Sequence, residues 1–155
     1  MLDVADIAVR ITAAGLIGGA IGLNRNLHHK YIGLRTLALI GAAASGIVLV
    51  TLDAAQGEAH VDAMSRVIQG LLTGVGFIGA GVIVRGPTEK KVHGLTTAAS
   101  VWTVAVIGIL CGAGVWRVAA VLVAVSAVIL LVGGPVERRV HAFFDALYGE
   151  DEPKE

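Results

Sequence analysis

Long apolar segments alternate with short polar links along most of the chain. A helix that crosses a bilayer needs about 20 mostly apolar residues, and five segments meet or approach that length. They run near Ile7–Leu23, Leu34–Leu52, Met64–Val84, Leu95–Leu110 and Val115–Val132. The link between the fourth and fifth segments is very short, which predicts a tight antiparallel hairpin. The pattern predicts an all-α, polytopic membrane protein with about five transmembrane helices.

The period of the apolar positions changes after the pair Gly134-Pro135. Apolar residues there share one face of a helix, and charged residues occupy the other face. The apolar residues are Val136, Val140, Phe143, Phe144 and Leu147. We expect a short amphipathic helix from Val136 to Tyr148 that lies on the membrane surface or under the bundle. The predicted division is a transmembrane domain over residues 1–134 and a cytoplasmic helix with an acidic tail over 135–155.

Composition agrees with the membrane class. Hydrophobic residues make up 55% of the 155 residues and charged residues 15%, against about 25% charged residues in a soluble domain. The formal net charge is zero, so the total charge carries no information about nucleic-acid or acidic partners, and we expect no nucleic-acid partner. A single cysteine, Cys111, excludes an intrachain disulfide. Met1 to Asp6 carries two acids and no base, so we expect no cleaved signal peptide and a first segment that stays in the mature protein.

The distribution of bases predicts the orientation in the membrane. The links Asn24–Gly33 and Arg85–Gly94 are rich in Lys and Arg, as is the segment after the fifth apolar span. The opposite ends of the spans carry mostly Asp and Glu. Because Lys and Arg concentrate in cytoplasmic loops, we expect the N-terminus outside and the C-terminus in the cytoplasm.

Glycines recur at helical spacing in the first and third spans, which indicates close helix packing. Small residues four positions apart let two helix backbones approach within a bilayer. We therefore expect these two spans at the tightly packed centre, and we expect Trp102 to pack against glycine. The sequence leaves open whether the partner helix belongs to the same chain or to a second copy, that is, a homodimer. The predicted packing residues are Gly15, Gly18, Gly19, Gly22, Gly70, Gly74, Gly76, Gly79, Gly81 and Trp102.

The sequence contains no complete motif for cofactor binding or catalysis. Gly74, Gly76 and Gly79 match the spacing G-x-G-x-x-G, but a dinucleotide site needs a strand before the motif and a phosphate-facing loop after it. The basic link after Arg85 lacks the second glycine of a phosphate loop. Metal-protease, paired-cysteine and nucleophile-elbow patterns are missing. We expect no enzyme activity, no cofactor and no metal site.

Hydroxyl and basic side chains at one end of the spans form the candidate functional cluster. Thr96, Ser100 and Thr103 share a helix face, and convergence with Arg35 and Arg85 would create a polar mouth of positive potential. Hydrogen bonds between helices are the alternative role for these hydroxyls. No carboxylate lies within spans three to five, which argues against a route for divalent cations. The candidate residues are Asn24, Arg25, Arg35, Thr36, Arg85, Thr96, Thr97 and Ser100.

Four motifs in order resemble the MgtC/SapB family of bacterial inner-membrane proteins. They are Gly22-Leu23-Asn24-Arg25, Gly33-Leu34-Arg35-Thr36, residues 76–83 (GFIGAGVI), and Gly94 to Ala99 followed by Trp102. The resemblance implies a five-span protein of the bacterial cytoplasmic membrane, associated with magnesium limitation and stress. It also implies a short, SapB-like member without a soluble C-terminal domain, and with Asn24 where the family usually has glutamate.

Two functions remain open at this stage. The resemblance and the glycine faces favour a regulatory protein that contacts other membrane proteins and the lipid bilayer. The alternative is a small transporter or channel for ions or small polar solutes, with its mouth near Arg35 and Arg85. The absence of carboxylates within spans three to five makes anions fit the second function better than magnesium.

Overall fold

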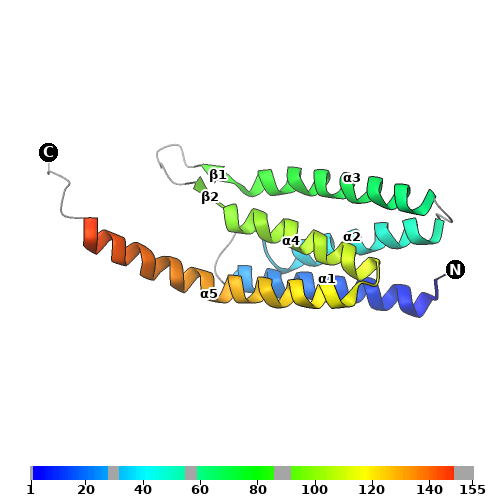
Figure 1. Ribbon diagram of the computed structural model, residues 1–155, viewed down its shortest axis with the longest axis horizontal. Helices are drawn as coiled ribbons and strands as arrows, with labels where there is room; N and C mark the ends of the chain where they lie inside the picture. Colours follow the sequence, from blue (N-terminus) through cyan, green and yellow to red (C-terminus); the bar gives the residue numbers. More distant parts are fainter. Residues whose placement is uncertain (1, 28–31, 55–58, 86–91, 149–155) are drawn as a thin grey trace.

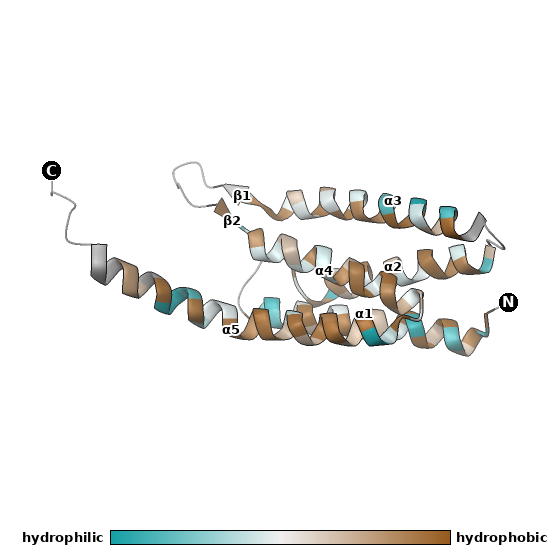
Figure 2. Ribbon diagram, in the orientation of Figure 1, coloured by the Kyte–Doolittle hydropathy of each residue, from teal (hydrophilic) through white to brown (hydrophobic). Residues whose placement is uncertain are grey.

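The computed structural model describes residues 2–27, 32–54, 59–85 and 92–148. The helices are α1 (Val4–Leu27), α2 (Leu34–Ala54), α3 (Ala59–Val82), α4 (Leu95–Gly112) and α5 (Trp116–Tyr148). Each of these five helices is long and apolar enough to cross a membrane. The predicted class, an all-α membrane protein with five spans, is confirmed. Its long helices run side by side (Figure 1) and consist largely of apolar residues (Figure 2), many of whose large side chains are exposed.

Helix α4 lies at the centre of the bundle. It packs against each of the other four helices, and half of its ten buried residues belong to an apolar core that residues of those four helices complete. Figure 1 shows α4 between α3 on one side and α1 with α5 on the other. The prediction that the first and third spans form the centre is therefore wrong for α3. In a helix that is apolar on all faces, hydropathy does not indicate which helix is enclosed.

Glycines of α1 allow it to lie directly against α2. A Cβ atom at Gly18 would lie 2.5 Å from the carbonyl oxygen of Leu37, and one at Gly22 would lie 2.7 Å from that of Gly33. Gly41 of α2 has the reciprocal relation with Ala14, at 2.6 Å from its carbonyl oxygen. Any side chain at these positions would force the backbones apart, so here the predicted glycine packing lies within one chain.

The same device joins α4 to α2. A Cβ atom at Gly108 would lie 2.5 Å from the carbonyl oxygen of Gly41, and one at Gly112 would lie 2.6 Å from that of Ser45. Gly41 therefore lies at a point where α1, α2 and α4 meet. These contacts bring the backbones of α4 and α2 close together.

The glycines of α3 do not pack in this way. At Gly70, Gly74, Gly76 and Gly81 an added Cβ would meet nothing within 4 Å, and at Gly79 it would make an ordinary contact with Ala98. Within one chain, these glycines are therefore not packing positions. Trp102 also departs from expectation, because its side chain is 46% exposed on α4 and is not among the nearest neighbours of any described glycine.

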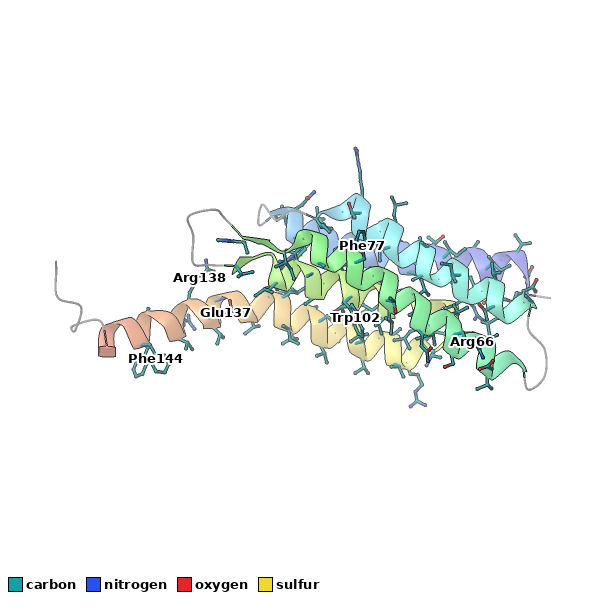
Figure 3. All side chains as sticks on the ribbon, turned by 90° about the horizontal axis from the view of Figure 1, so that it is seen from above. Arg66, Phe77, Trp102, Glu137, Arg138 and Phe144 are labelled. Atoms are coloured by element: carbon teal, nitrogen blue, oxygen red, sulfur yellow. The ribbon has the colours of Figure 1, made fainter. Side chains whose placement is uncertain are left out.

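The C-terminal amphipathic segment is helical, but it continues α5 rather than starting a new helix. Helix α5 passes through Gly133, Gly134 and Pro135 without interruption to Tyr148. Figure 3 shows its last part, with Glu137, Arg138 and Phe144, extending past the bundle rather than under it. Proline within a helix removes one hydrogen bond, and a glycine pair before it leaves room for the local adjustment this requires.

A two-residue strand pair connects α3 to α4. Strand β1 (Val84–Arg85) pairs antiparallel with β2 (Val92–His93). Gly94 follows β2 with a φ of 93°, and a Cβ atom there would collide with the carbonyl group of Val82. The left-handed conformation and the close approach both require glycine. This turn fixes where the first residues of α4 lie.

Candidate functional site

A buried arginine and a buried threonine meet where α1 ends and α4 begins. The Arg25 terminal nitrogen Nη2 donates a hydrogen bond of 2.8 Å to Oγ1 of Thr97. Arg25 is 7% exposed and Thr97 is 1% exposed. Among the described residues, Arg25 is the one charged side chain in the buried class. A buried charge is costly unless it is paired, so this pair is the strongest candidate for a functional site.

The helix faces explain why these two residues meet. Gly18, Gly22 and Arg25 are spaced i, i+4 and i+7, so they share the face of α1 that packs against α2 and α4. Thr97 lies on the face of α4 that continues through Val101, Val104 and Gly108, all of which are buried. The close approach at Gly18 and Gly22 therefore places the next turn of α1 beside the first turn of α4.

Arg25 has a nitrogen without a partner. Its Nε atom is buried and makes no hydrogen bond to any group in the described part of the chain. No salt bridge involves Arg25 within residues 2–27, 32–54, 59–85 and 92–148. The guanidinium group thus has no described counter-ion and has at least one unused donor.

The other candidate residues do not join this pair in one enclosed cavity. Arg35, Thr36 and Thr96 are exposed on the first turns of α2 and α4. Ser100 is buried, but its hydroxyl donates 2.8 Å to the carbonyl oxygen of Thr96 within its own helix. The backbone of Arg85 lies in β1, and its side chain lies outside the described part of the structure. Asn24 is partly buried and has an interaction of its own.

Sequence reasoning missed a second arginine contact at the opposite end of α4. The Arg10 guanidinium lies 2.8 Å from the Asp6 carboxylate, four residues earlier in α1. Arg10 Nη1 also donates 2.9 Å to the carbonyl oxygen of Gly112, the last residue of α4. A cation at a helix C-terminus interacts favourably with the helix dipole. No sequence pattern indicates this contact, because it depends on the close approach of Arg10 to Gly114 in the tertiary structure.

An open apolar groove of about 490 Å³ runs between α2 and α3. It is lined by residues that include Ile40, Ala44, Ile47, Gly70, Gly74 and Ile78. Phe77 projects from α3 nearby and is 83% exposed (Figure 3). The lining offers almost no polar group, so the groove suits apolar side chains rather than a polar solute.

The residues that the structure describes contain no set of metal ligands. No group of three or more His, Cys, Asp or Glu side chains there is placed to hold a metal ion. Cys111 is free and buried within α4. The candidate site is therefore the Arg25–Thr97 pair, with the groove as a separate apolar feature.

Comparison with known proteins identifies relatives of this membrane domain. The profile described as MgtC family matches residues 11–139. Protein SrpB of Synechococcus elongatus is 39% identical over 115 residues, which cover 68% of this chain and 63% of SrpB. Protein MgtC of Brucella abortus is 37% identical over 114 residues, or 74% of this chain and 45% of that protein. No solved structure matches the chain significantly.

A third relative gives the same result. Protein MgtC of Salmonella typhimurium is 38% identical over 104 residues, which cover 67% of this chain and 42% of that protein. The chain therefore spans less than two thirds of the length of these curated relatives. The family match extends from within α1 to the segment of α5 beyond Pro135. With its five apolar helices, this chain is a multi-pass membrane protein that belongs to the MgtC family.

Proposed function

We propose that this protein regulates other membrane proteins by binding them through the exposed face of α3. The setting is magnesium limitation or stress adaptation, as the family resemblance implies. The observation that carries the proposal is the open space at Gly70, Gly74, Gly76 and Gly81, where an added Cβ would meet nothing within 4 Å. Neighbouring backbones block Gly18 and Gly22 of α1 and Gly108 and Gly112 of α4, whereas these four glycines of α3 are available to a helix from another protein.

The groove beside α3 supports this proposal. Gly70 and Gly74 form part of its wall, and Ile40 and Ile47 of α2 form the opposite wall. Helix association in lipid depends on close van der Waals packing, because the lipid tails are as apolar as the side chains. A groove with a glycine wall lets a partner helix approach closely along its length. A helix of another membrane protein is the proposed occupant, and a second copy of this chain is the alternative.

The orientation belongs to the same proposal. We place the protein in the bacterial inner membrane with its N-terminus outside and its C-terminus in the cytoplasm. Bases near Arg25, Arg35 and Arg138 lie at one end of the spans, and Asp6 and Asp53 lie at the other. The positive-inside rule assigns the basic end to the cytoplasm.

Photo-crosslinking from Phe77 tests the proposal. Phe77 is replaced by benzoylphenylalanine in the full chain, expressed in its native membrane, and crosslinked products are identified by mass spectrometry. We expect crosslinks to one or a few other membrane proteins. Adding Gly74→Leu should reduce these crosslinks at least about fivefold, because overpacking a helix contact costs about 1–3 kcal/mol.

Two controls make the result specific. Gly46→Leu is the matched glycine control, because an added Cβ there also meets nothing within 4 Å and Gly46 does not line the groove. Benzoylphenylalanine at Val121, which is 64% exposed on α5, reports random contacts in the membrane. Equal products from positions 77 and 121 would overturn the proposal, and products made only of this chain would assign the face to a homodimer.

Transport is the competing function, and liposomes distinguish it. The predicted mouth lies near two arginines. Arg35 is the one whose side chain the structure describes, and it is exposed. Specific ion flux through the purified protein that is abolished by Arg35→Ala would contradict a purely regulatory role. We expect liposomes containing the protein to show no flux above empty liposomes.

A further inference from the structure

Arg25 and Arg10 occupy opposite ends of the same helix contact, and their surroundings differ in charge. Both lie on α1, and the same number of residues separates Arg10 from Arg25 as separates Thr97 from Gly112. Arg10 is neutralised by Asp6 and lies at the negative end of α4. Arg25 has no carboxylate partner in the described ranges and lies at the positive end of α4. One arginine therefore has a carboxylate counter-ion and the other has none in the described ranges, although the Nε atom of each is buried without a hydrogen-bond partner.

The first turn of α4 adds further donors beside Arg25. Its N-cap residue is Gly94, which has no side chain to accept a hydrogen bond from the first turn. The first helical hydrogen bond runs from the Ala98 N–H group to the Gly94 carbonyl oxygen, at 2.8 Å. The N–H groups of Leu95, Thr96 and Thr97 precede that bond and have no acceptor within the helix. Such a helix N-terminus favours an anion.

We propose that Arg25 and the first turn of α4 form a binding site for a phosphate oxyanion. Guanidinium nitrogens and backbone N–H groups are hydrogen-bond donors, and an oxyanion supplies several acceptors of matching geometry. The buried Nε of Arg25 gains an acceptor, and the buried positive charge gains a counter-ion. The C-terminal end of α1 offsets part of this charge but gives Nε no hydrogen-bond acceptor. A cation is disfavoured here, because the Arg25 guanidinium has no described carboxylate to neutralise its charge.

The first turn of α4 is exposed beside the buried Arg25–Thr97 pair. Leu95 is 58% exposed and Thr96 is exposed, so the first turn of α4 extends to the outside of the bundle. This end of the spans is also the basic end, where Arg35 is exposed on the first turn of α2. The phosphate group has two sources at this depth: the headgroup of an anionic lipid, or inorganic phosphate in solution. The same donors serve both.

Binding to the purified full chain tests the site without any protein partner. The unfolding midpoint is measured in detergent with sodium phosphate against sodium chloride at equal ionic strength, and in nanodiscs of phosphatidylglycerol against phosphatidylcholine. Stabilisation by soluble phosphate assigns the site to the free anion. Stabilisation confined to phosphatidylglycerol assigns it to the lipid headgroup.

Variants decide whether Arg25 carries the effect. We expect Arg25→Gln to weaken the apparent affinity at least about tenfold, because hydrogen bonds to charged groups are worth about 1.5–3 kcal/mol. Arg35→Gln is the matched control, since it removes an exposed arginine near the same end and should leave the affinity unchanged. Arg25→Lys retains the charge without the forked donors and should bind with intermediate affinity.

Several results would overturn the site. Equal loss in Arg25→Gln and Arg35→Gln would indicate general attraction to a basic surface. The site would also be contradicted if neither phosphate nor phosphatidylglycerol stabilised the protein relative to its reference condition. If Arg25→Gln does not fold, Arg25→Lys supplies the comparison, because it keeps the buried charge. These outcomes do not involve α3, so they are independent of the proposed regulatory function.

Discussion

At the scale of single residues, the same amino acid has two different roles in this bundle. Gly18, Gly41 and Gly108 lie where a Cβ atom would collide with a neighbouring backbone, whereas Gly74 and Gly81 face open space. The sequence pattern is the same in both groups, because it records spacing along one helix. The identity of the neighbour decides whether a glycine is structural.

Substitution of Gly108 by alanine should destabilise the bundle. The added Cβ would lie 2.5 Å from the Gly41 carbonyl oxygen and 2.8 Å from the Ala44 Cβ, so the helices must separate, at a cost of about 1–3 kcal/mol. Gly81→Ala should leave stability unchanged or raise it by up to about 1 kcal/mol, through helix propensity. Unfolding in detergent micelles measures both variants. Equal stabilities would show that α2 and α4 are not in close contact.

Hydroxyl groups illustrate what sequence reasoning can reach. Ser100 and Ser126 bond to carbonyl oxygens four residues earlier, at 2.8 Å and 2.6 Å, as expected for serine in apolar helices. Ser45 also lies in an apolar helix, but its hydroxyl is buried and has no hydrogen-bond partner among the described residues. Its neighbour Gly112 comes from a distant part of the chain. Local bonds follow from the sequence, and exceptions arise from packing.

At the scale of elements, an arginine links the ends of α1 and α4. Arg10 binds both Asp6 of its own helix and the Gly112 carbonyl oxygen of α4. Arg66 and Asp62 form a comparable pair within α3, with 2.9 Å between their atoms, but the two side chains are 76% and 68% exposed. The ion pair in α1 was predictable from its spacing. The contact with α4 was not, because it joins two separate helices.

Replacing these two arginines separates the helix link from the local ion pair. Arg10→Met should lower the free energy of unfolding by about 1–3 kcal/mol, since it removes charge-assisted hydrogen bonds and leaves the last carbonyl of α4 without this donor. Arg66→Met should change it by less than about 0.5 kcal/mol, because exposed pairs contribute little. Steric-trap or thermal unfolding of both variants provides the comparison. A similar small change in both would remove the proposed role of Arg10 as a link.

At the scale of the whole molecule, the five spans place the chain ends on opposite sides of the bundle. Figure 1 shows the N-terminus at one end and the last turns of α5 beyond the other. Helix α5 passes through Pro135 as one element, so its charged C-terminal part continues the fifth span. Charge distribution then supplies the direction in the membrane.

Cysteine labelling tests this orientation. Asp3→Cys and Glu137→Cys are made separately in a Cys111→Ala background, since Cys111 is the one natural cysteine. A membrane-impermeant maleimide should label position 3 in intact spheroplasts and position 137 only after permeabilisation. The reverse pattern would invert the predicted topology and place the Arg25 site on the outer face.

The sequence by itself determined the class, the five spans and most helix ends, because hydropathy and helical period are local properties. Predicted and observed spans agree within a few residues at most ends; the clearest exceptions are the end of α1, the start of α3 and the continuation of α5 beyond Pro135. Only the tertiary structure decided that α4 is central, that the α3 glycines remain open and that Arg25 meets Thr97, 72 positions away. In apolar helices every face is suitable for burial, so the sequence does not specify which faces meet. Backbone contacts between distant segments make that choice, and they create the buried charge at the end of α1.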